Sequence, residues 1–167
     1  MQATELKQLM QMLRRYCYSL TGGVAADIDD LVQQTLEVVF SKAVPSEVKL
    51  STWAYKVCTN LWIDQYRRQK REQLSEVMPD SLVDPANEEQ AMQDKLLLNQ
   101  VKIAMQQLTA EHRQVLALVT LNGMSYQEVA EILDIPVGTV MSRLARARNQ
   151  LTQLLLLAQQ GNRHEYQ

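Results

Sequence analysis

The stretch that most constrains the fold of this chain is residues 125–151, SYQEVAEILDIPVGTVMSRLARARNQL. Its pattern predicts two amphipathic helices joined by a short turn. Ser125 and Glu128 have the spacing of a capping box, in which each residue satisfies a free backbone N–H of the other. Asp134–Ile135–Pro136 breaks the pattern, because proline lacks a backbone N–H and restricts the residue before it. Apolar residues then return at helical spacing and form one stripe: Val140, Leu144, Ala147 and Leu151.

The polar side of the second helix carries hydroxyl, amide and guanidinium groups but no carboxylate. No Asp or Glu occurs between Val137 and Leu157, whereas an ordinary solvated face mixes both signs of charge. An apolar stripe opposite such a face lets a helix pack on a protein while lying in the major groove of DNA. An ordinary helical hairpin with solvated arginines has the same spacing, so this stretch alone leaves both interpretations open.

The composition predicts an all-α chain of two small helical domains. Apolar residues make up 46% of the 167 residues, enough for folded cores, while Gly (5) and Pro (4) are scarce and no long period-two pattern predicts a sheet. Residues 76–100 carry six acidic groups and one basic group and include turn-rich stretches. We therefore expect a first domain over 1–73, a flexible acidic linker over 74–92, a second domain over 93–160 and a flexible tail over 161–167.

Helical periodicity places five further helices before the opening stretch. They are expected over residues 4–20, 25–43, 51–72, 88–107 and 110–121. Ser51 and Thr109 are the expected caps of the third and fifth helices. The expected inward face of the fourth helix is Leu96, Leu97, Val101, Ala104, Met105 and Leu108.

The helix over 51–72 combines a basic stripe with an arc of aromatic residues. The stripe is Lys56, Asn60, Ile63, Arg67 and Lys70, and the arc is Tyr55, Trp62 and Tyr66. Basic groups beside aromatics suit contact with phosphates and unstacked bases. A purely structural interpretation stays open, because the helix dipole alone favours cations at a helix C-terminus and tryptophan commonly belongs to a core.

The sequence contains none of the spacings that common catalytic and metal sites require. It has no glycine-rich phosphate loop, no HExxH and no nucleophile elbow, and its histidines and cysteines (His112, His164, Cys17 and Cys58) form no cluster. We therefore expect no enzyme activity, cofactor or metal. The start of the chain has no secretion signal and the longest apolar run, 154–158, is too short to span a membrane, so we expect a soluble cytoplasmic protein.

Two parts of the chain together resemble one family. Residues 29–40 (DDLVQQTLEVVF) and 51–71 (STWAYKVCTNLWIDQYRRQKR) resemble the second conserved region of bacterial sigma factors, most closely the extracytoplasmic-function (ECF) group. Residues 108–151 resemble the fourth region of that group, and the run IPxGTVxSRLxRAR is the most specific piece. The matching segments follow family order, with a linker where the family has one.

The resemblance implies a non-catalytic subunit that binds core RNA polymerase and directs promoter choice. The fourth region would read the −35 element as duplex, and the second region would bind the −10 element and capture bases of the non-template strand. The implied partners are promoter DNA, the β′ clamp helices and β flap of the polymerase, and an anti-sigma factor, without membrane insertion. By matching position, the implied −35 residues are Met141, Ser142, Ala145 and Arg146, with Thr139, Arg143 and Arg148 as flanking or phosphate contacts. The implied −10 residues are Lys56, Asn60, Ile63, Arg67 and Lys70, and the implied polymerase-binding residues are Asp30, Gln33, Gln34 and Glu37.

Three departures from the family pattern stand out. Met141 lies where many relatives carry a basic residue and Ala145 is short, so the −35 preference stays open; Asp134 replaces a common glycine, and Leu50 stands where an aromatic is usual. Two other functions also stay open. A stand-alone helix-turn-helix regulator would bind duplex operators as a dimer, and a protein-binding adaptor would not need DNA at all. Polymerase-dependent initiation on a panel of promoters would separate the three.

Overall fold

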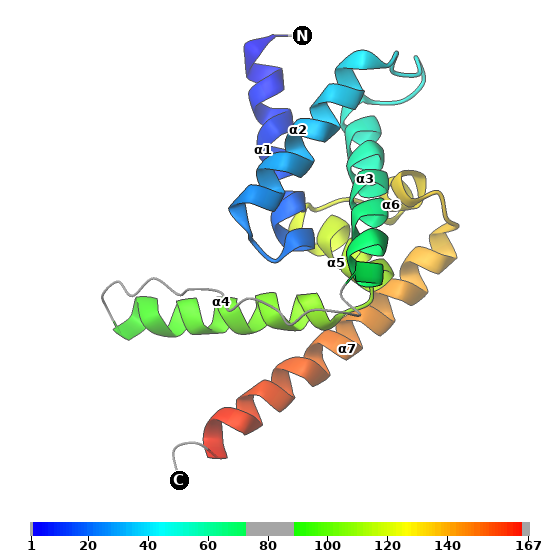
Figure 1. The fold of residues 1–167 in the computed structure, drawn as a ribbon. Helices are drawn as coiled ribbons and strands as arrows, with labels where there is room; N and C mark the ends of the chain where they lie inside the picture. The colour runs from blue at the N-terminus through cyan, green and yellow to red at the C-terminus, as the bar shows by residue number, and fades with distance from the viewer. Residues whose placement is uncertain (1, 73–88, 165–167) are drawn as a thin grey trace.

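The computed structural model describes residues 2–72 and 89–164, and every regular element in these ranges is helical (Figure 1). The first half contains α1 (Ala3–Thr21), α2 (Ala25–Ser41) and α3 (Leu50–Glu72). The second half contains α4 (Glu89–Gln107), α5 (Ala110–Leu116), the π-helical turn η1 (Ala117–Leu121), α6 (Tyr126–Leu133) and α7 (Val137–His164). The predicted all-α class and the two helical halves are confirmed. Most of the predicted linker lies outside the described residues.

The first half is a three-helix unit around a buried seam of apolar and hydroxyl side chains. Tyr16 of α1 shares a hydrogen bond with Thr59 of α3 (2.8 Å between the oxygens) and packs edge-on against Tyr55, with ring centroids 5.3 Å apart. Leu13 and Leu31 are fully buried beside them. Each such leucine stabilises the fold by roughly 1.5–3 kcal/mol relative to an exposed one. α1 ends at Gly22, whose φ of 75° is the left-handed conformation that glycine adopts without strain.

The second half is built on α5, which starts as predicted and ends differently. The Thr109 hydroxyl accepts a hydrogen bond from the His112 backbone N–H at 3.3 Å, which confirms the expected cap. The helix expected over 110–121 instead widens into a π-helical turn at Ala117. Asn122 ends that turn, since its side-chain amide donates to the Ala117 carbonyl at 2.7 Å.

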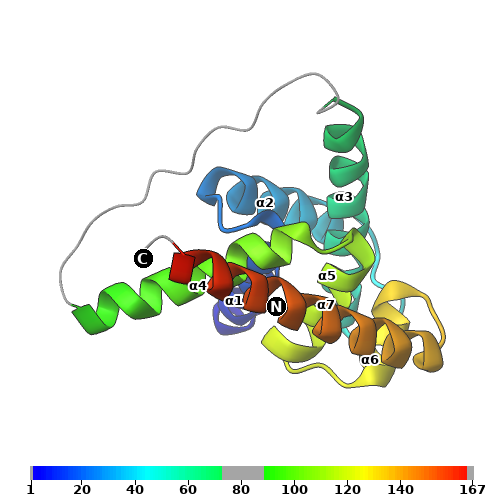
Figure 2. The ribbon, with the colours of Figure 1, turned by 90° about the horizontal axis from the view of Figure 1, so that it is seen from below.

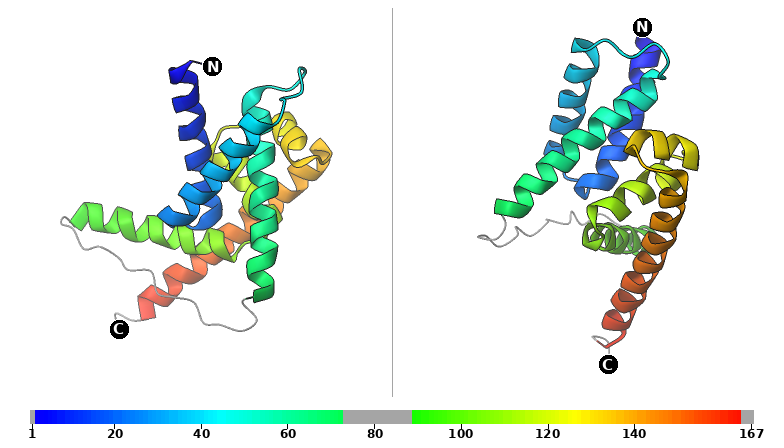
Figure 3. Two further views of the ribbon diagram at one scale, coloured as in Figure 1. Left: turned by 45° about the horizontal axis from the view of Figure 1, so that its top comes forward. Right: turned by 90° about the vertical axis from the view of Figure 1, so that its right-hand side faces the viewer.

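The two halves share one continuous apolar core. α1 packs against α5 and η1, and α3 packs against α5 and α6. Figure 3 shows α6 lying beside α3 in both views. The side chains buried on the second-half side of this core include Val115, Leu118, Val129, Ile132, Val140 and Leu144. The structure is therefore a closed arrangement of the two halves.

Several local predictions are wrong. Leu96 and Leu97 are 58% and 53% exposed rather than inward, because α4 extends away from the rest of the molecule and only its C-terminal part is covered (Figures 1 and 2). The Lys49 carbonyl accepts the first helical bond of α3 from Trp53, so Ser51 lies inside the helix instead of capping it.

The C-terminal helix is longer than predicted. Residues 161–164, assigned above to a flexible tail, are the last residues of α7, and 165–167 lie outside the described residues. The second part of α7 carries the exposed residues Leu156 and Leu157. Across the described parts of the chain, no helix combines the length and apolar character needed to cross a membrane.

Candidate nucleic-acid interface

The start of α6 has the capping box that the sequence predicts. The Glu128 backbone N–H donates to the Ser125 hydroxyl (3.2 Å), and the Ser125 N–H donates to the Glu128 carboxylate (2.9 Å). The hydrogen bond from the Ser125 backbone lowers the pKa of the Glu128 carboxyl below its usual value. The carboxylate therefore helps to fix the helix that precedes the turn.

The turn between α6 and α7 confirms the predicted tight break. Asp134 takes the left-handed conformation (φ 55°, ψ 49°), which aspartate tolerates better than most residues. The Ile135 N–H donates back to the Ala130 carbonyl at 3.1 Å. The Pro136 carbonyl accepts the first bonds of α7, from Thr139 (3.0 Å) and Val140 (3.2 Å).

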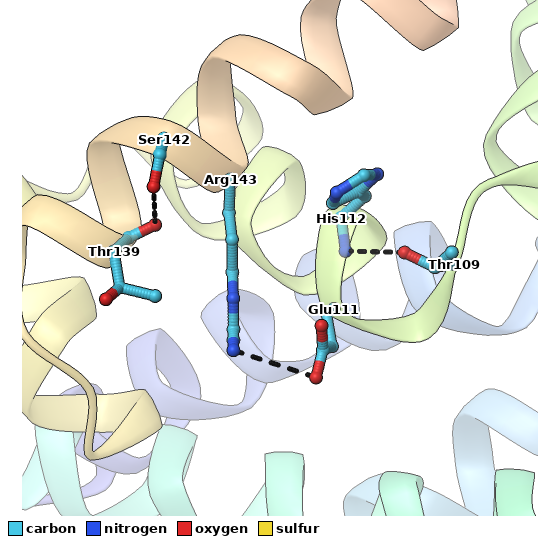
Figure 4. A network of polar contacts seen from close by, with 6 residues as sticks. All are labelled: Thr109, Glu111, His112, Thr139, Ser142 and Arg143. Atoms are coloured by element: carbon cyan, nitrogen blue, oxygen red, sulfur yellow. Dashed lines mark hydrogen bonds and ion pairs between the residues drawn. The ribbon is translucent and has the colours of Figure 1, made fainter.

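α7 presents its acid-free face outward. Its apolar stripe, Val140, Leu144 and Ala147, is at most 2% exposed. Of the implied −35 residues, the exposed ones are Met141, Ser142, Ala145, Arg146 and Arg148. Thr139 and Arg143 are half-buried. The single hydroxyl hydrogen of Ser142 is shared between the Gly138 and Thr139 carbonyls, which leaves the oxygen lone pairs as acceptors. Figure 4 shows the contact with Thr139.

Arg143 turns toward α5 rather than outward. Its Nη2 atom lies 3.6 Å from the Glu111 carboxylate, beside the Thr109 cap (Figure 4). Glu111 is largely exposed, so the pair stabilises the fold by only about 0–1 kcal/mol and exchanges readily.

Part of the basic stripe of α3 borders the second half. Asn60, Arg67 and Lys70 are exposed, and Lys56 and Ile63 are half-buried. A hollow of about 150 Å³ is lined by Thr59, Asn60, Ile63 and Arg67 of α3 and by Glu111, Gln114, Ile132, Leu133 and Arg143 of the second half. The structure therefore brings three implied −10 residues and one implied −35 residue to the same hollow.

Two of the three residues in the aromatic arc of α3, Tyr55 and Trp62, are not available for unstacked bases in this structure. Tyr55 and Trp62 are 1% and 4% exposed. Tyr55 packs on Tyr16, and the Trp62 ring lies beneath the guanidinium group of Arg113. Base contact by Tyr55 and Trp62 does not fit this arrangement, because both rings face the rest of the protein, whereas Tyr66 is half-buried.

The implied polymerase-binding residues are exposed on α2. Two of them, Gln33 and Glu37, are joined by a 3.1 Å hydrogen bond and line a cleft of about 490 Å³ between α1 and α2. The Gln34 amide oxygen instead accepts a hydrogen bond from Gln65 of α3 at 3.1 Å, and Asp30 lies outside the cleft lining.

The sequence analysis missed the apolar residues of this α1–α2 cleft. Phe40 is 56% exposed there, and Met10 and Leu36 line the same surface. An ion pair between Arg14 and Asp29 (2.7 Å) borders it. Periodicity within single helices could not reveal a surface that α1 and α2 build together.

The described residues hold no group of three or more His, Cys, Asp or Glu side chains that could bind a metal ion. The two thiols meet in the core of the first half, with the sulfur atoms of Cys17 and Cys58 3.5 Å apart. The hydrogen bond to Cys58, together with burial, raises the pKa of Cys17 far above its usual value. Cys17 therefore packs as a neutral thiol in the core.

Comparison with known proteins places both halves in one family. Residues 6–72 match the family profile for Sigma-70 region 2, and residues 98–151 match that for Sigma-70, region 4. The ECF RNA polymerase sigma factor EcfG of Rhodopseudomonas palustris is 32% identical over 145 residues, covering 86% of this chain and 78% of that protein. The ECF RNA polymerase sigma factor SigE of Mycolicibacterium smegmatis is 31% identical over 154 residues, and there the match spans 90% of this chain but 60% of the relative.

A solved structure shares the arrangement of the helices. The sigma factor RpoE from Bartonella quintana, in complex with the anti-sigma factor NepR, superposes with a TM-score of 0.73 at 29% identity, covering 91% of this chain and 94% of that one. With both regions in family order on this shared fold, the chain belongs to the extracytoplasmic-function group of the sigma-70 family of RNA polymerase sigma factors.

Proposed function

We propose that this chain binds core RNA polymerase and directs it to promoters whose −35 element is read by α7 and whose −10 element is opened by α3. One observation carries the proposal. Two basic helix faces, one seated on a helix-turn-helix and one on a three-helix unit, occur in one chain in the order of the two sigma regions. The protein acts as a non-catalytic subunit and works in the cytoplasm with the polymerase.

The −35 role is supported by the exposed face of α7. Met141, Ser142, Ala145 and Arg146 lie toward the base edges of the major groove, and Arg148 lies toward the phosphates. Good bidentate contacts discriminate between bases by about 1–3 kcal/mol each, whereas phosphate contacts fix position without sequence information. Because Met141 and Ala145 offer no hydrogen-bond donor, Arg146 and Ser142 carry most of the direct readout.

The −10 role is supported by the stripe on α3. Lys56, Arg67 and Lys70 attract the phosphates of the melted strand, while Asn60 and Ile63 contact its bases. Unstacking a base costs a few kcal/mol, which contacts to the extruded base offset. This division assigns duplex positioning to α7 and strand opening to α3.

Polymerase contact is supported by the α1–α2 cleft. Its apolar centre, Met10, Leu36 and Phe40, is rimmed by charged and amide groups, including Asp29 and Glu37. An apolar centre with a polar rim is typical of protein interfaces. We assign this surface, with Asp30 and Gln34 at its side, to the β′ clamp helices, and the second half to the β flap. Because the related RpoE was solved with an anti-sigma factor, we also propose that an anti-sigma factor regulates this chain.

The test combines purified core RNA polymerase, this chain and a panel of promoter fragments, scored for specific initiation and strand opening. We expect polymerase-dependent initiation on at least one fragment. Arg146→Ala should weaken −35 recognition, whereas Arg163→Ala, an exposed arginine at the far end of the same helix, should not. Asn60→Ala should impair opening, whereas Gln69→Ala, exposed on α3 off the stripe, should not.

Two results would replace the proposal by an alternative. Tight, sequence-specific duplex binding that is unaffected by polymerase would identify a stand-alone operator-binding regulator. If neither Arg146→Ala nor Asn60→Ala changed initiation or strand opening, the chain would be a protein-binding adaptor.

A further inference from the structure

Arg143 lies at the border between the exposed and the buried face of α7. Thr139 and Arg146, which precede and follow it by about one turn, belong to the implied −35 residues. Val140 and Ala147, its neighbours on the other side, are fully buried. Residues three or four apart are adjacent on a helix surface, so a long side chain at this border can turn either way. The Arg143 side chain is 24% exposed and turns toward α5 (Figure 4).

Glu111 is the carboxylate toward which Arg143 turns. It lies in the first turn of α5, beside the Thr109 cap, where the helix dipole favours a negative charge. α5 packs along α7, and a 3.0 Å hydrogen bond between His112 Nδ1 and Gln150 Oε1 joins the two helices there. The position of Glu111 beside α7 therefore does not depend on its contact with Arg143.

The contact between the two side chains is loose enough to exchange. The Arg143 Nη2 atom lies 3.6 Å from the Glu111 carboxylate, whereas strong charge-assisted pairs lie at about 2.7–2.9 Å. The Glu111 side chain is 63% exposed, so water screens the attraction. A phosphate group can accept two parallel hydrogen bonds from a guanidinium group. Arg143 can therefore leave Glu111 when a duplex phosphate comes within reach.

Glu111 places a negative charge beside a helix that has none of its own. α7 contains no Asp or Glu from Val137 to His164. Neutralisation of phosphates by cations supplies the sequence-independent part of DNA affinity. A carboxylate that competes with phosphate for one of these cations reduces that part of the affinity.

We propose that Glu111 is a positioning residue for the −35 contact, which holds Arg143 at the edge of the reading face of α7 and yields it to a phosphate when duplex DNA binds. The inference rests on the proposed −35 role of α7. After the exchange Glu111 stays beside the phosphates and lowers the affinity for every duplex alike. The base contacts of Ser142 and Arg146 then account for a larger share of the total affinity.

A salt titration of duplex binding by the whole chain tests the inference. The probes are the most active duplex of the promoter panel and a scrambled duplex of the same length, and fluorescence anisotropy measures the affinity at several low salt concentrations. The variants are Glu111→Gln, Arg143→Gln and the double variant. Asp94→Asn is the matched control, because it removes an exposed carboxylate from the part of α4 that extends away from the body (Figure 1). Thermal unfolding checks that every variant is folded.

We expect Glu111→Gln to raise the affinity for both duplexes by about twofold to fivefold at low salt, the range of an exposed ion pair. The factor should be the same for each duplex, because phosphate contacts carry no sequence information. The slope of log affinity against log salt concentration should become steeper by up to about 0.9, because no carboxylate remains to take up a cation. In the Arg143→Gln chain, Glu111→Gln should have no more effect than Asp94→Asn.

Three outcomes would overturn the inference. An unchanged affinity and slope with a lower unfolding midpoint would make the pair a purely structural link between α5 and α7. An equal gain with and without Arg143 would mean that Glu111 acts only by repelling phosphates directly. A gain confined to the promoter duplex would mean that Glu111 affects base readout. Arg146→Ala, measured in parallel, tests the proposed function itself: if it does not weaken binding to the promoter duplex, the −35 role of α7 is wrong and the inference fails with it.

Arg143→Lys gives an independent readout. Lysine keeps the positive charge but lacks the planar fork of the guanidinium group. Glu111→Gln should therefore still raise the affinity of the Arg143→Lys chain, by a smaller factor than with arginine in place. If Arg143→Lys behaved like Arg143→Gln, the charge of residue 143 would not be what Glu111 controls, and the exchange would be contradicted.

Discussion

The two basic helices of this protein, α3 and α7, carry similar side chains but differ in what lies beside them. On α7 the buried stripe packs inward and the implied −35 residues Met141 and Arg146 face solvent. On α3 the implied −10 residues Asn60 and Arg67 are also exposed, but they line a hollow whose other wall is formed by the second half. The charges are alike, so the difference comes from packing between the halves rather than from either helix alone.

This difference fits the two tasks. Duplex DNA presents its groove edges without rearrangement, so a helix that reads it can stay exposed. A melted strand exists only after base pairs have been separated at an energetic cost. A surface that captures such a strand is needed only at that stage.

The largest effect is expected from disrupting the packing of α7 against the core. Leu144 is 2% exposed, and Leu144→Ala should lower the free energy of unfolding by about 2–5 kcal/mol because it removes buried methyl groups and leaves a cavity. The neighbouring exposed change Ala145→Ser should alter it by less than about 0.5 kcal/mol. Urea unfolding followed by circular dichroism measures both. Equal effects of the two changes would show that α7 does not pack against the core through the face that carries Leu144.

The next largest effect is expected on duplex binding, where Arg146 of α7 is compared with Arg67 of α3. In the free chain at low salt, Arg146→Ala should weaken duplex −35 binding by about 1–3 kcal/mol, whereas Arg67→Ala should change it little because Arg67 lies on α3 and not on the helix that reads the −35 duplex. With core polymerase, both changes should reduce initiation. Fluorescence anisotropy and run-off transcription provide the two readouts. A loss of duplex binding by the free Arg67→Ala protein equal to that of Arg146→Ala would remove the distinction between the helices.

Local patterns predicted the elements of this fold well. The capping box at Ser125, the cap at Thr109 and the break at Asp134 each depend on residues within four positions of one another, and the structure confirms all three. The sequence also predicted the buried stripe of α7, because one helix face repeats along the chain. The π-helical turn at Ala117 was not predicted, since it changes the hydrogen-bond register without changing the apolar pattern.

Predictions that depend on contacts between elements were less successful. Leu96 and Leu97 have the spacing of a core face, but α4 extends beyond the body and nothing among the described residues covers them. Trp62 and Tyr55 lie beside basic residues in the sequence, which is typical of base-stacking residues. In the structure Trp62 packs against Arg113 of the second half and Tyr55 packs against Tyr16 of α1. The contacts of Arg113 with the Leu20 carbonyl and the Trp62 ring were not predicted, because both partners are far from it along the chain.

A smaller effect is expected from removing the cap of α6, which positions the turn before α7. Ser125→Ala removes the acceptor for the Glu128 N–H and should lower the free energy of unfolding by about 1 kcal/mol. The loss should be greatest at neutral pH. The pKa of Glu128 is lowered in the folded state, so its stabilisation is present above its usual range and is lost as the pH falls through the folded pKa. Urea unfolding at neutral and acidic pH measures this difference, and Ser142→Ala, on the exposed face of α7, is the control. Alanine keeps the backbone N–H that donates to the carboxylate, so a Ser125→Ala loss that did not shrink in acid would mean that the hydroxyl does not strengthen that hydrogen bond.

The smallest effect is expected at the hydrogen bond between Tyr55 of α3 and Asn122 of the second half. Tyr55→Phe removes the hydrogen bond to Asn122 and should lower the free energy of unfolding by about 0.5–1.5 kcal/mol at neutral pH, near the lower end because the bond is long. Burial raises the pKa of Tyr55 to about 12. Between pH 10 and 12 the unfolded chain ionises this phenol while the folded chain does not, so wild-type stability falls as the pH rises. Tyr55→Phe lacks this loss, and its deficit should shrink in alkali, although Tyr16, whose pKa burial also raises, still contributes in both proteins. A double-mutant cycle with Asn122→Ala, measured by urea unfolding at pH values on either side of this range, isolates the pair. A coupling energy of zero at neutral pH would mean that this hydrogen bond does not help to hold the two halves together.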